Sequence, residues 1–353
     1  MRVLVTGATG FTGGHLARRL ASLGYAVRAL VRQRPVPAVE AGFSRPDSRP
    51  DAYPVEAGFS RPGSRPGSRP DIEYVQGDLR DAAAVQRAAA GVDVVYHIAA
   101  IYRQAGLKQA EYRAVNTEAV RTVIEAAGRG GARRVVHCST VGVHGDVEHP
   151  PANEEAPLRP GDVYQETKLE GERVAREVSK RVGVEAVIAR PSGIYGPGDR
   201  RLLKLFRGVS RRRFIILGDG RIFYHLTYID DLVEGLRLCG EVPAAAGRTY
   251  ILAGGEVTTL NELVALIAEE ARVPAPTLHL PAWPFWLAGA ACEAACAPLG
   301  IEPPLYRRRV DFFTKSRAFD IGRARAELGY APQVSLREGI RRTLDWYRSA
   351  GWL

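Results

Sequence analysis

Tyr164 and Lys168 stand four residues apart in a segment with helical spacing, 163–181, so both side chains lie on one helix face. Hydride transfer to a carbonyl needs a proton donor at the developing alkoxide. A tyrosine has an ordinary pKa of about 10, and a nearby ammonium lowers that pKa because it favours the phenolate. The pair therefore predicts acid–base chemistry, with Tyr164 as the acid and Lys168 as its cation.

Two hydroxyl groups, those of Ser139 and Thr140, follow a predicted strand at 134–138. Thr140 would hydrogen-bond the substrate oxygen on which charge develops. The four cysteines are too few and too scattered for a disulfide framework or a zinc cage, so no metal is predicted. Reduced thiols and the absence of a signal-like start favour a cytoplasmic protein.

A glycine-rich turn at residues 6–13 follows a strand and opens a helix, which is the context of a dinucleotide-binding turn. Gly7 allows the tight turn, Gly10 lets the backbone approach a pyrophosphate, and Gly13 lets the helix pack on the strand. Phe11 and Thr12 begin that helix, where free N–H groups point toward the phosphates. The turn predicts a bound dinucleotide.

Cofactor preference depends on the end of the second strand, where an acidic residue would bind the ribose 2′-hydroxyl and favour NAD. Here the strand ends at Val31 and Arg32 follows. Because a cation without an acid suits a 2′-phosphate, we predict that NADP(H) is preferred over NAD(H). The alternative is that Arg32 is only the first basic residue of the next segment.

A parallel sheet would position these residues. Strands are predicted at 3–5, 26–31, 72–75, 92–97, 134–138 and 184–189, with helices between them at 82–90, 111–127 and 163–181. This alternation predicts an α/β fold with a doubly wound parallel sheet, because strand–helix–strand crossovers are right-handed. Shorter elements at 214–217, 231–239, 249–252 and 260–271, and helices at 320–328 and 336–349, predict a smaller mixed α/β C-terminal lobe.

Residues 33–70 interrupt this alternation. The stretch 39–46 recurs as 55–62, and both copies are followed by Ser-Arg-Pro units. Such sequence cannot bury enough apolar surface to offset its ordering entropy, so we predict a disordered low-complexity insertion. The predicted domains are therefore 1–195, which binds the dinucleotide and contains the insertion, and 196–353, a substrate-binding lobe interleaved with the first.

The chain has 353 residues and a formal net charge of +10, with 46% hydrophobic and 25% charged residues. That composition is typical of a folded globular protein and excludes a wholly disordered chain. Because the arginines are spread over the whole chain, we expect solvated faces rather than a nucleic-acid site.

The segment 280–299 is unusually apolar. It begins with the aromatic residues Trp283, Phe285 and Trp286 and continues as a predicted apolar helix whose single acidic residue is Glu293. With the arginines at 307–309, the region 283–309 would suit a membrane interface. The alternative is that this helix packs over the substrate pocket as core. Either position favours a lipophilic substrate.

Taken together, the motifs resemble the extended short-chain dehydrogenase/reductase family, that is, the NAD-dependent epimerase/dehydratase superfamily. The matching pieces run in that family's order at 6–13, 77–79, 97–100, 115–116, 138–140, 164–168, 190–198 and 228–232. The resemblance implies a Rossmann-type sheet and extends over nearly the whole chain, whereas the insertion at 33–70 is foreign to it.

The resemblance also implies roles at the matching positions. Asp78 and Leu79 would line the adenine site, and Ala99 and Pro191 would approach the cofactor. Lys168 would hold the nicotinamide ribose, in addition to the glycine turn already described.

For the reaction itself, Thr140 matches the family's active-site Ser/Thr, with Ser139 as its neighbour. Tyr164 would be the general acid/base, and Asn116 would support a water relay. Members of the family often dimerise through the helix that bears the Tyr/Lys pair, so a homodimer is a further expectation.

The C-terminal residues 317–347 look most like the 3β-hydroxysteroid dehydrogenase and dihydroflavonol-reductase-like branch, although sugar-modifying relatives share that ending. Enzymes of this family that act on nucleotide sugars usually have an arginine at the position of Tyr224, and here Arg221 lies three residues earlier. The first hypothesis is an NADP(H)-dependent oxidoreductase of a steroid-, terpenoid- or flavonoid-like substrate. The second is a nucleotide-sugar epimerase or dehydratase with tightly bound NAD(P). The third is a non-enzymatic dinucleotide-binding sensor or RNA-associated protein.

Overall fold

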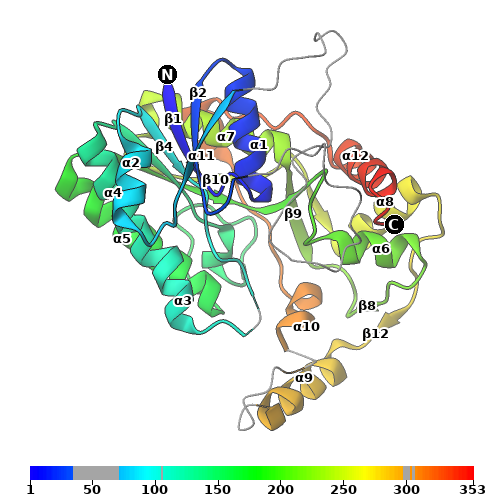
Figure 1. Cartoon of the computed structure of the whole chain (residues 1–353). Helices are drawn as coiled ribbons and strands as arrows, with labels where there is room; N and C mark the ends of the chain where they lie inside the picture. Colours follow the sequence, from blue (N-terminus) through cyan, green and yellow to red (C-terminus); the bar gives the residue numbers. More distant parts are fainter. Residues whose placement is uncertain (35–70, 105, 297–302, 304–306) are drawn as a thin grey trace.

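A computed structural model of the chain describes residues 1–34, 71–104, 106–296, 303 and 307–353 (Figure 1). The predicted insertion, 33–70, lies outside these residues except for Gln33 and Arg34.

A seven-stranded sheet in the order β10-β6-β5-β4-β1-β2-β3 forms the centre of the molecule, and its strands pair in parallel. The bounds are β1 Arg2–Thr6, β2 Ala26–Val31, β3 Ile72–Gln76, β4 Val94–His97, β5 Arg134–Cys138, β6 Glu185–Pro191 and β10 Thr249–Leu252. The doubly wound Rossmann-type sheet is thus confirmed. The strand order reverses between β4 and β1, which is where such sheets bind their ligands.

Helices cover both faces of this sheet. The helices α1 (Phe11–Ser22) and α7 (Ile229–Glu241) pack on one face, and α2 (Ala82–Ala89), α4 (Ala119–Gly130) and α5 (Val163–Val182) on the other. The apolar side chains of α4 and α5 recur at helical spacing, which explains why each buries one face against the strands.

The smaller lobe is built on two short sheets. One has the order β11-β9-β7 and the other pairs β12 with β8. The bounds are β7 Gly193–Tyr195, β8 Ile216–Leu217, β9 Phe223–Tyr228, β11 Val257–Thr259 and β12 His279–Leu280, and the helices are α6 Leu203–Ser210, α8 Leu260–Ala271, α9 Ala282–Cys296, α10 Arg307–Thr314, α11 Gly322–Leu328 and α12 Leu336–Ser349. One apolar core runs from the α1/α7 face of the large sheet into this lobe.

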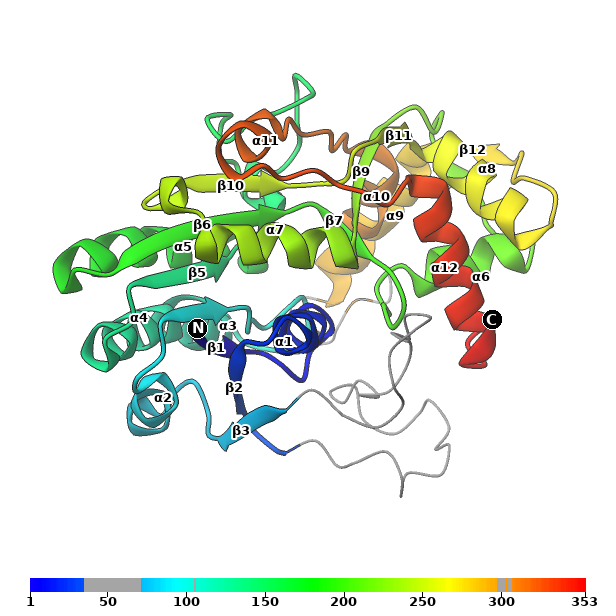
Figure 2. The ribbon, with the colours of Figure 1, turned by 90° about the horizontal axis from the view of Figure 1, so that it is seen from above.

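Two elements that the sequence places in the lobe belong to the large sheet instead. The strand β10 pairs with β6 at the sheet edge (Figure 2), and α7 packs against α1, β5 and β6. The chain therefore returns to the first domain after residue 195 before it completes the lobe. This return cannot be read from hydrophobic pattern alone, since an edge strand and a lobe strand have the same period.

The predicted helix 111–127 is also divided. It begins as α3 (Gln109–Arg113), passes through a π-helical turn (Ala114–Glu118) and continues as α4. Such turns often occur at functional sites, because they redirect side chains within a helix. In the part of the chain that the structure describes, no helix combines the length and apolarity needed to cross a bilayer.

Candidate active site

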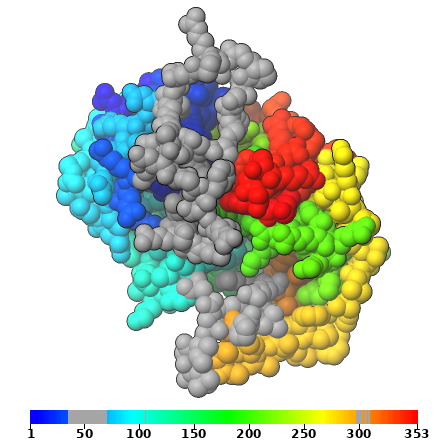
Figure 3. Space-filling model, turned by 45° about the vertical axis from the view of Figure 1, so that its right-hand side comes forward, coloured from blue at the N-terminus to red at the C-terminus, as the bar shows by residue number. Residues whose placement is uncertain are grey.

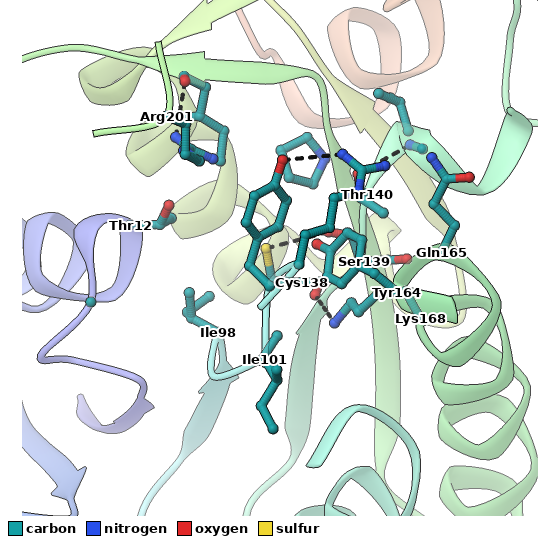
Figure 4. Close-up of a pocket in the computed structure, with 18 of the residues that line it drawn as sticks. Thr12, Ile98, Ile101, Cys138, Ser139, Thr140, Tyr164, Gln165, Lys168 and Arg201 are labelled. Atoms are coloured by element: carbon teal, nitrogen blue, oxygen red, sulfur yellow. Dashed lines mark hydrogen bonds between the residues drawn. The ribbon is translucent and has the colours of Figure 1, made fainter. Parts of the chain in front are cut away.

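A cavity of about 1310 Å³ opens at the carboxyl ends of the strands, between the large sheet and the lobe. Every sequence-predicted site residue except Asn116 lines it. Figure 4 shows Thr140, Tyr164 and Lys168 together on one side, with Thr12 at the start of α1 across the space and Arg201 from the lobe above. The fold thus brings together residues that are far apart in the chain, such as Thr12 and Arg201.

The glycine turn has the close packing that its spacing predicts. Gly7 has a φ of +72°, and a Cβ there would lie 2.8 Å from backbone atoms of Ala99. A Cβ on Gly13 would lie 2.2 Å from the carbonyl oxygen of Gly7. Gly10 caps α1 without a side-chain hydrogen bond, and the first turn has no acidic residue. This positive helix end therefore fits a pyrophosphate.

The adenosine end of the cavity is lined by Arg32, Asp78, Leu79 and Arg80. Arg80 donates two hydrogen bonds to the Asp78 carboxylate at 2.9 and 2.8 Å. These bonds, with a smaller effect of Arg32, lower the pKa of Asp78 to about 2. Asp78 is therefore ionised and held in place, and Arg32 lies close enough to influence it.

The Tyr164 side chain lies in the cavity, and the groups around it affect its acidity. The Lys168 ammonium is buried and donates to the Cys138 carbonyl oxygen at 2.7 Å. Burial raises the pKa of Tyr164, and the cations that oppose this rise are Arg103 and Arg201. Helical spacing fixes the face that Lys168 shares with Tyr164, but not the acceptor that its long side chain reaches.

Arg103 and Tyr102 are parts of the site that the sequence did not reveal. The Arg103 guanidinium lies 5.6 Å from the centre of the Tyr164 ring, and the Tyr102 ring meets the same ring edge-on at 5.0 Å. Arg103 Nε donates to Asp162, the N-cap of α5, at 2.8 Å. No local signal marks these residues, because Asp162 lies 59 positions from Arg103.

Ser139 and Thr140 differ in what their hydroxyls face. Ser139 is buried, and its Oγ donates to the Glu172 carboxylate at 2.6 Å. Glu172 also accepts two bonds from Arg190, at 2.9 and 2.7 Å. The Thr140 side chain is only partly buried, and its Oγ1 accepts the Gly142 N–H at 3.0 Å. Thr140 is therefore placed to meet a substrate, whereas the Ser139 hydroxyl is committed to the network behind the cavity.

Asn116 does not line the cavity, and its support of a water relay stays a prediction. It is buried in the π-helical turn, and its side-chain amide binds both backbone groups of Ile101, at 2.8 and 3.0 Å. Its Nδ2 also donates to Thr167 Oγ1 on α5 at 3.2 Å. Asn116 thus holds the loop that carries Tyr102 and Arg103 against α5.

The lobe completes the cavity from the opposite side. Tyr224 lines it, and its hydroxyl donates to the Phe312 carbonyl oxygen. Arg221 is exposed and does not line the cavity. Arg317 does line it, beside Tyr224, and its guanidinium donates to the carbonyl oxygens of Lys315 and Asp311. Within the described residues, no carboxylate lies within ion-pair distance of Arg317.

Known proteins share both the sequence motifs and the fold of this chain. The NAD dependent epimerase/dehydratase family matches residues 3–253 of this chain. The chain is 32% identical over 293 residues to "3beta-hydroxysteroid-dehydrogenase/decarboxylase isoform 2" of Arabidopsis thaliana, which covers 78% of this chain but only 52% of that protein. It is 29% identical over 355 residues to "2-alkyl-3-oxoalkanoate reductase" of Stenotrophomonas maltophilia, which covers 97% of this chain and 98% of that protein.

A solved structure of MoeE5 in complex with UDP-glucose and NAD superimposes with a TM-score of 0.72 at 25% identity, over 99% of both chains. The family match covers well over half of the chain and includes the glycine turn, the Tyr164/Lys168 pair and the seven-stranded sheet. The chain therefore belongs to the NAD-dependent epimerase/dehydratase family of extended short-chain dehydrogenases/reductases.

Proposed function

We propose that this enzyme is an NADP(H)-dependent oxidoreductase that acts on a hydroxyl or carbonyl group of a hydrophobic substrate. The observation that carries this proposal is the lining of the cavity around Tyr164. Around Tyr164 the lining combines charged side chains, such as Arg103 and Asp162, with a set of apolar and aromatic ones, which are Ile98, Ile101, Tyr102, Leu107, Ile194, Leu226, Phe312 and Phe319. Ligand sites of this kind bind apolar molecules and orient them through a few polar groups.

The polar groups near Tyr164 suit a reacting oxygen. NADP(H), when bound, would supply or accept the hydride. Thr140 would donate its hydroxyl proton to the substrate oxygen, because a hydroxyl that accepts the Gly142 N–H still has a proton to donate. Tyr164 would give or take the proton at the same oxygen, and the nearby Arg103 guanidinium favours the phenolate in the oxidative direction.

The preference for NADP(H) is supported by Arg32, which lines the adenosine end after a strand that ends at Val31. The test compares the Kd of NADPH and NADH for the wild type, Arg32→Ala and Arg34→Ala. Arg34 has the same charge but does not line the cavity, so Arg34→Ala is the matched control. We expect Arg32→Ala to weaken NADPH binding about tenfold or more while NADH binding is kept. Equal affinity for both cofactors in the wild type would refute the preference.

The substrate class is tested with cofactor-free protein, NADPH and a panel of ketones graded in hydrophobicity, from acetone-sized molecules to steroid-sized ones. The expected result is NADPH oxidation with kcat/KM rising with apolar surface. Tyr164→Phe serves as the inactive control and should still bind NADPH. Failure of every hydrophobic ketone, with NADPH bound normally, would refute the proposed substrate class.

One observation favours a second candidate, a nucleotide-sugar epimerase or dehydratase. Arg317 places a guanidinium in the cavity, where it binds backbone carbonyl oxygens and the Tyr224 side chain and, among the described residues, forms no ion pair with a carboxylate. A diphosphate would suit that cation. The two candidates differ in cofactor turnover. An epimerase would retain its dinucleotide through purification and convert a UDP-sugar without net NADPH consumption, whereas the proposed reductase binds NADPH reversibly and consumes it.

A further inference from the structure

The helix α9 exposes an unusual share of large apolar side chains. Twelve large hydrophobic side chains are well exposed in the described part of the chain, and four of them lie between 283 and 287. The exposed fractions are 67% for Trp283, 37% for Phe285, 44% for Trp286 and 52% for Leu287. This exposure contradicts the alternative that the helix packs as core over the substrate pocket. In the space-filling view, α9 forms the lower edge of the molecule (Figure 3).

The exposed face continues along the whole helix. Its members are exposed and recur at helical spacing, and they are Trp283, Trp286, Leu287, Ala291, Ala294 and Ala295, which we call the α9 face. The one charged residue of the helix, Glu293, is engaged by α10, where Arg307 donates its backbone N–H and its Nε to the carboxylate, both at 2.8 Å. The α9 face therefore contains no charged side chain.

The surroundings of the α9 face indicate what covers it. The Arg307 guanidinium lies 5.5 Å from the centre of the Trp286 ring, so a cation adjoins the aromatic end of an apolar surface. The chain as a whole has a net charge of +10. Tryptophan beside arginine on an apolar helix is the combination that suits the headgroup boundary of an anionic bilayer. With 15 residues, α9 is about 22 Å long, enough to lie along that boundary but too short to cross it.

We propose that α9 docks in the headgroup region of an anionic phospholipid bilayer, with the α9 face toward the acyl chains and the Arg307–Glu293 ion pair at the level of the headgroups. A second copy of the chain fits less well, because a dimer interface normally has a polar rim around its apolar centre. Here the net charge of +10 of the chain favours an anionic surface over a second, equally positive copy. The side chains of Arg308 and Arg309 lie outside the described structure.

Docking in this position would bring the cavity to the membrane. The helix α9 packs against α10, and three residues of α10 or its end, Asp311, Phe312 and Lys315, line the cavity. Figure 1 shows α10 between α9 and the rest of the molecule. A lipophilic substrate could then pass from the bilayer to the cavity beside α10. This delivery step rests on the proposed function, whereas docking itself does not.

The test measures flotation of the full chain with vesicles of phosphatidylcholine, with or without phosphatidylglycerol, in the absence of cofactor and substrate. The test variant is Trp283→Glu/Leu287→Glu, whose two side chains are exposed and outside the cavity. The control is Leu23→Glu, which adds a charge at an apolar residue 43% exposed at the end of α1. We expect wild type and control to bind the anionic vesicles, less strongly at high salt, and the test variant to bind at least about tenfold more weakly.

Two results would overturn the proposal. One is vesicle binding that is absent in the wild type or unchanged in the test variant. The other is a wild type that is dimeric by size-exclusion chromatography, becomes monomeric in the test variant and ignores vesicles, because the α9 face would then join two copies. Quenching of tryptophan fluorescence by brominated lipids gives an independent readout of insertion. Because no turnover is measured, a wrong substrate class cannot produce any of these outcomes.

Discussion

Removal of the Ser139 hydroxyl and removal of the neighbouring Thr140 hydroxyl should affect different properties of the protein, stability in the first case and turnover in the second. Ser139→Ala deletes a 2.6 Å hydrogen bond to the buried Glu172 carboxylate, while Thr140→Ala deletes a hydroxyl that faces the cavity. The first change is therefore expected to lower stability, and the second to lower turnover. The two residues are neighbours in sequence and nearly equal in size, so each variant controls for the other.

The magnitudes follow from what each oxygen contacts. A hydrogen bond to a charged group contributes about 1.5–3 kcal/mol to stability. Glu172 keeps both bonds from Arg190, so Ser139→Ala should cost about 2 kcal/mol rather than the 3–5 kcal/mol expected when a buried ion pair is broken. Removing a donor to a developing oxyanion costs about 10²–10³ in kcat. Thr140→Ala should lose that much, with about 1 kcal/mol of stability from the lost cap on the Gly142 N–H.

The assay pairs chemical unfolding, for the free energy of unfolding, with single-turnover NADPH oxidation on the best ketone of the panel. Thr140→Ser, which keeps the hydroxyl, should recover most of kcat. The reasoning would be refuted if Ser139→Ala kept full stability and lost turnover as severely as Thr140→Ala. That result would mean that the Ser139 hydroxyl leaves Glu172 and meets the substrate.

Two further predictions concern titrating groups. The Arg103 cation opposes the rise in the pKa of Tyr164. Arg103→Ala should therefore shift the pH profile of kcat for alcohol oxidation upward by about one pH unit, and Arg103→Lys should shift it less. An unchanged pH profile in Arg103→Ala would contradict this prediction. Burial lowers the pKa of His15 to about 4, so the unfolded chain binds more protons between pH 6.5 and 4 and stability falls as the pH falls through that window. Between pH 7 and pH 5 the free energy of unfolding of the wild type should fall by about 2 kcal/mol more than that of His15→Gln. Urea unfolding at the two pH values measures both losses. Equal losses in the two proteins would argue against this prediction.

Much of the dinucleotide half was predictable because its signals are local. The glycine turn, β2 at Ala26–Val31 and β5 at Arg134–Cys138 were predicted with the bounds that the structure shows, and the element predicted at 260–271 in the lobe is the helix α8. In each of these elements, apolar residues recur at the spacing of a strand or a helix, and a turn or a capping residue lies within a few positions. Thr259, for example, caps α8 with Glu262 in a reciprocal capping box.

The parts that sequence reasoning missed depend on contacts between distant segments. Arg103 reaches Tyr164 only because a loop after β4 folds over the start of α5. The acceptor of Lys168 is a backbone carbonyl 30 residues away, on β5. Nothing in residue type or spacing distinguishes Tyr102 and Arg103 from an ordinary surface pair, so their place in the site required the tertiary structure.

The buried network behind the cavity explains how such separate segments hold one geometry. Glu172 on α5 binds Ser139 after β5 and Arg190 at the end of β6, and Arg190 also donates to the Glu154 carbonyl oxygen at 3.2 Å. A buried ion pair adds little net stability, because desolvation offsets the attraction between its charges. In this protein the ion pair instead positions two elements relative to each other, α5, which contains Tyr164, and the end of β5, which is followed by Thr140. A shift of either element would leave a buried charge unpaired, so the network fixes the distance between the proposed acid and the proposed oxyanion donor.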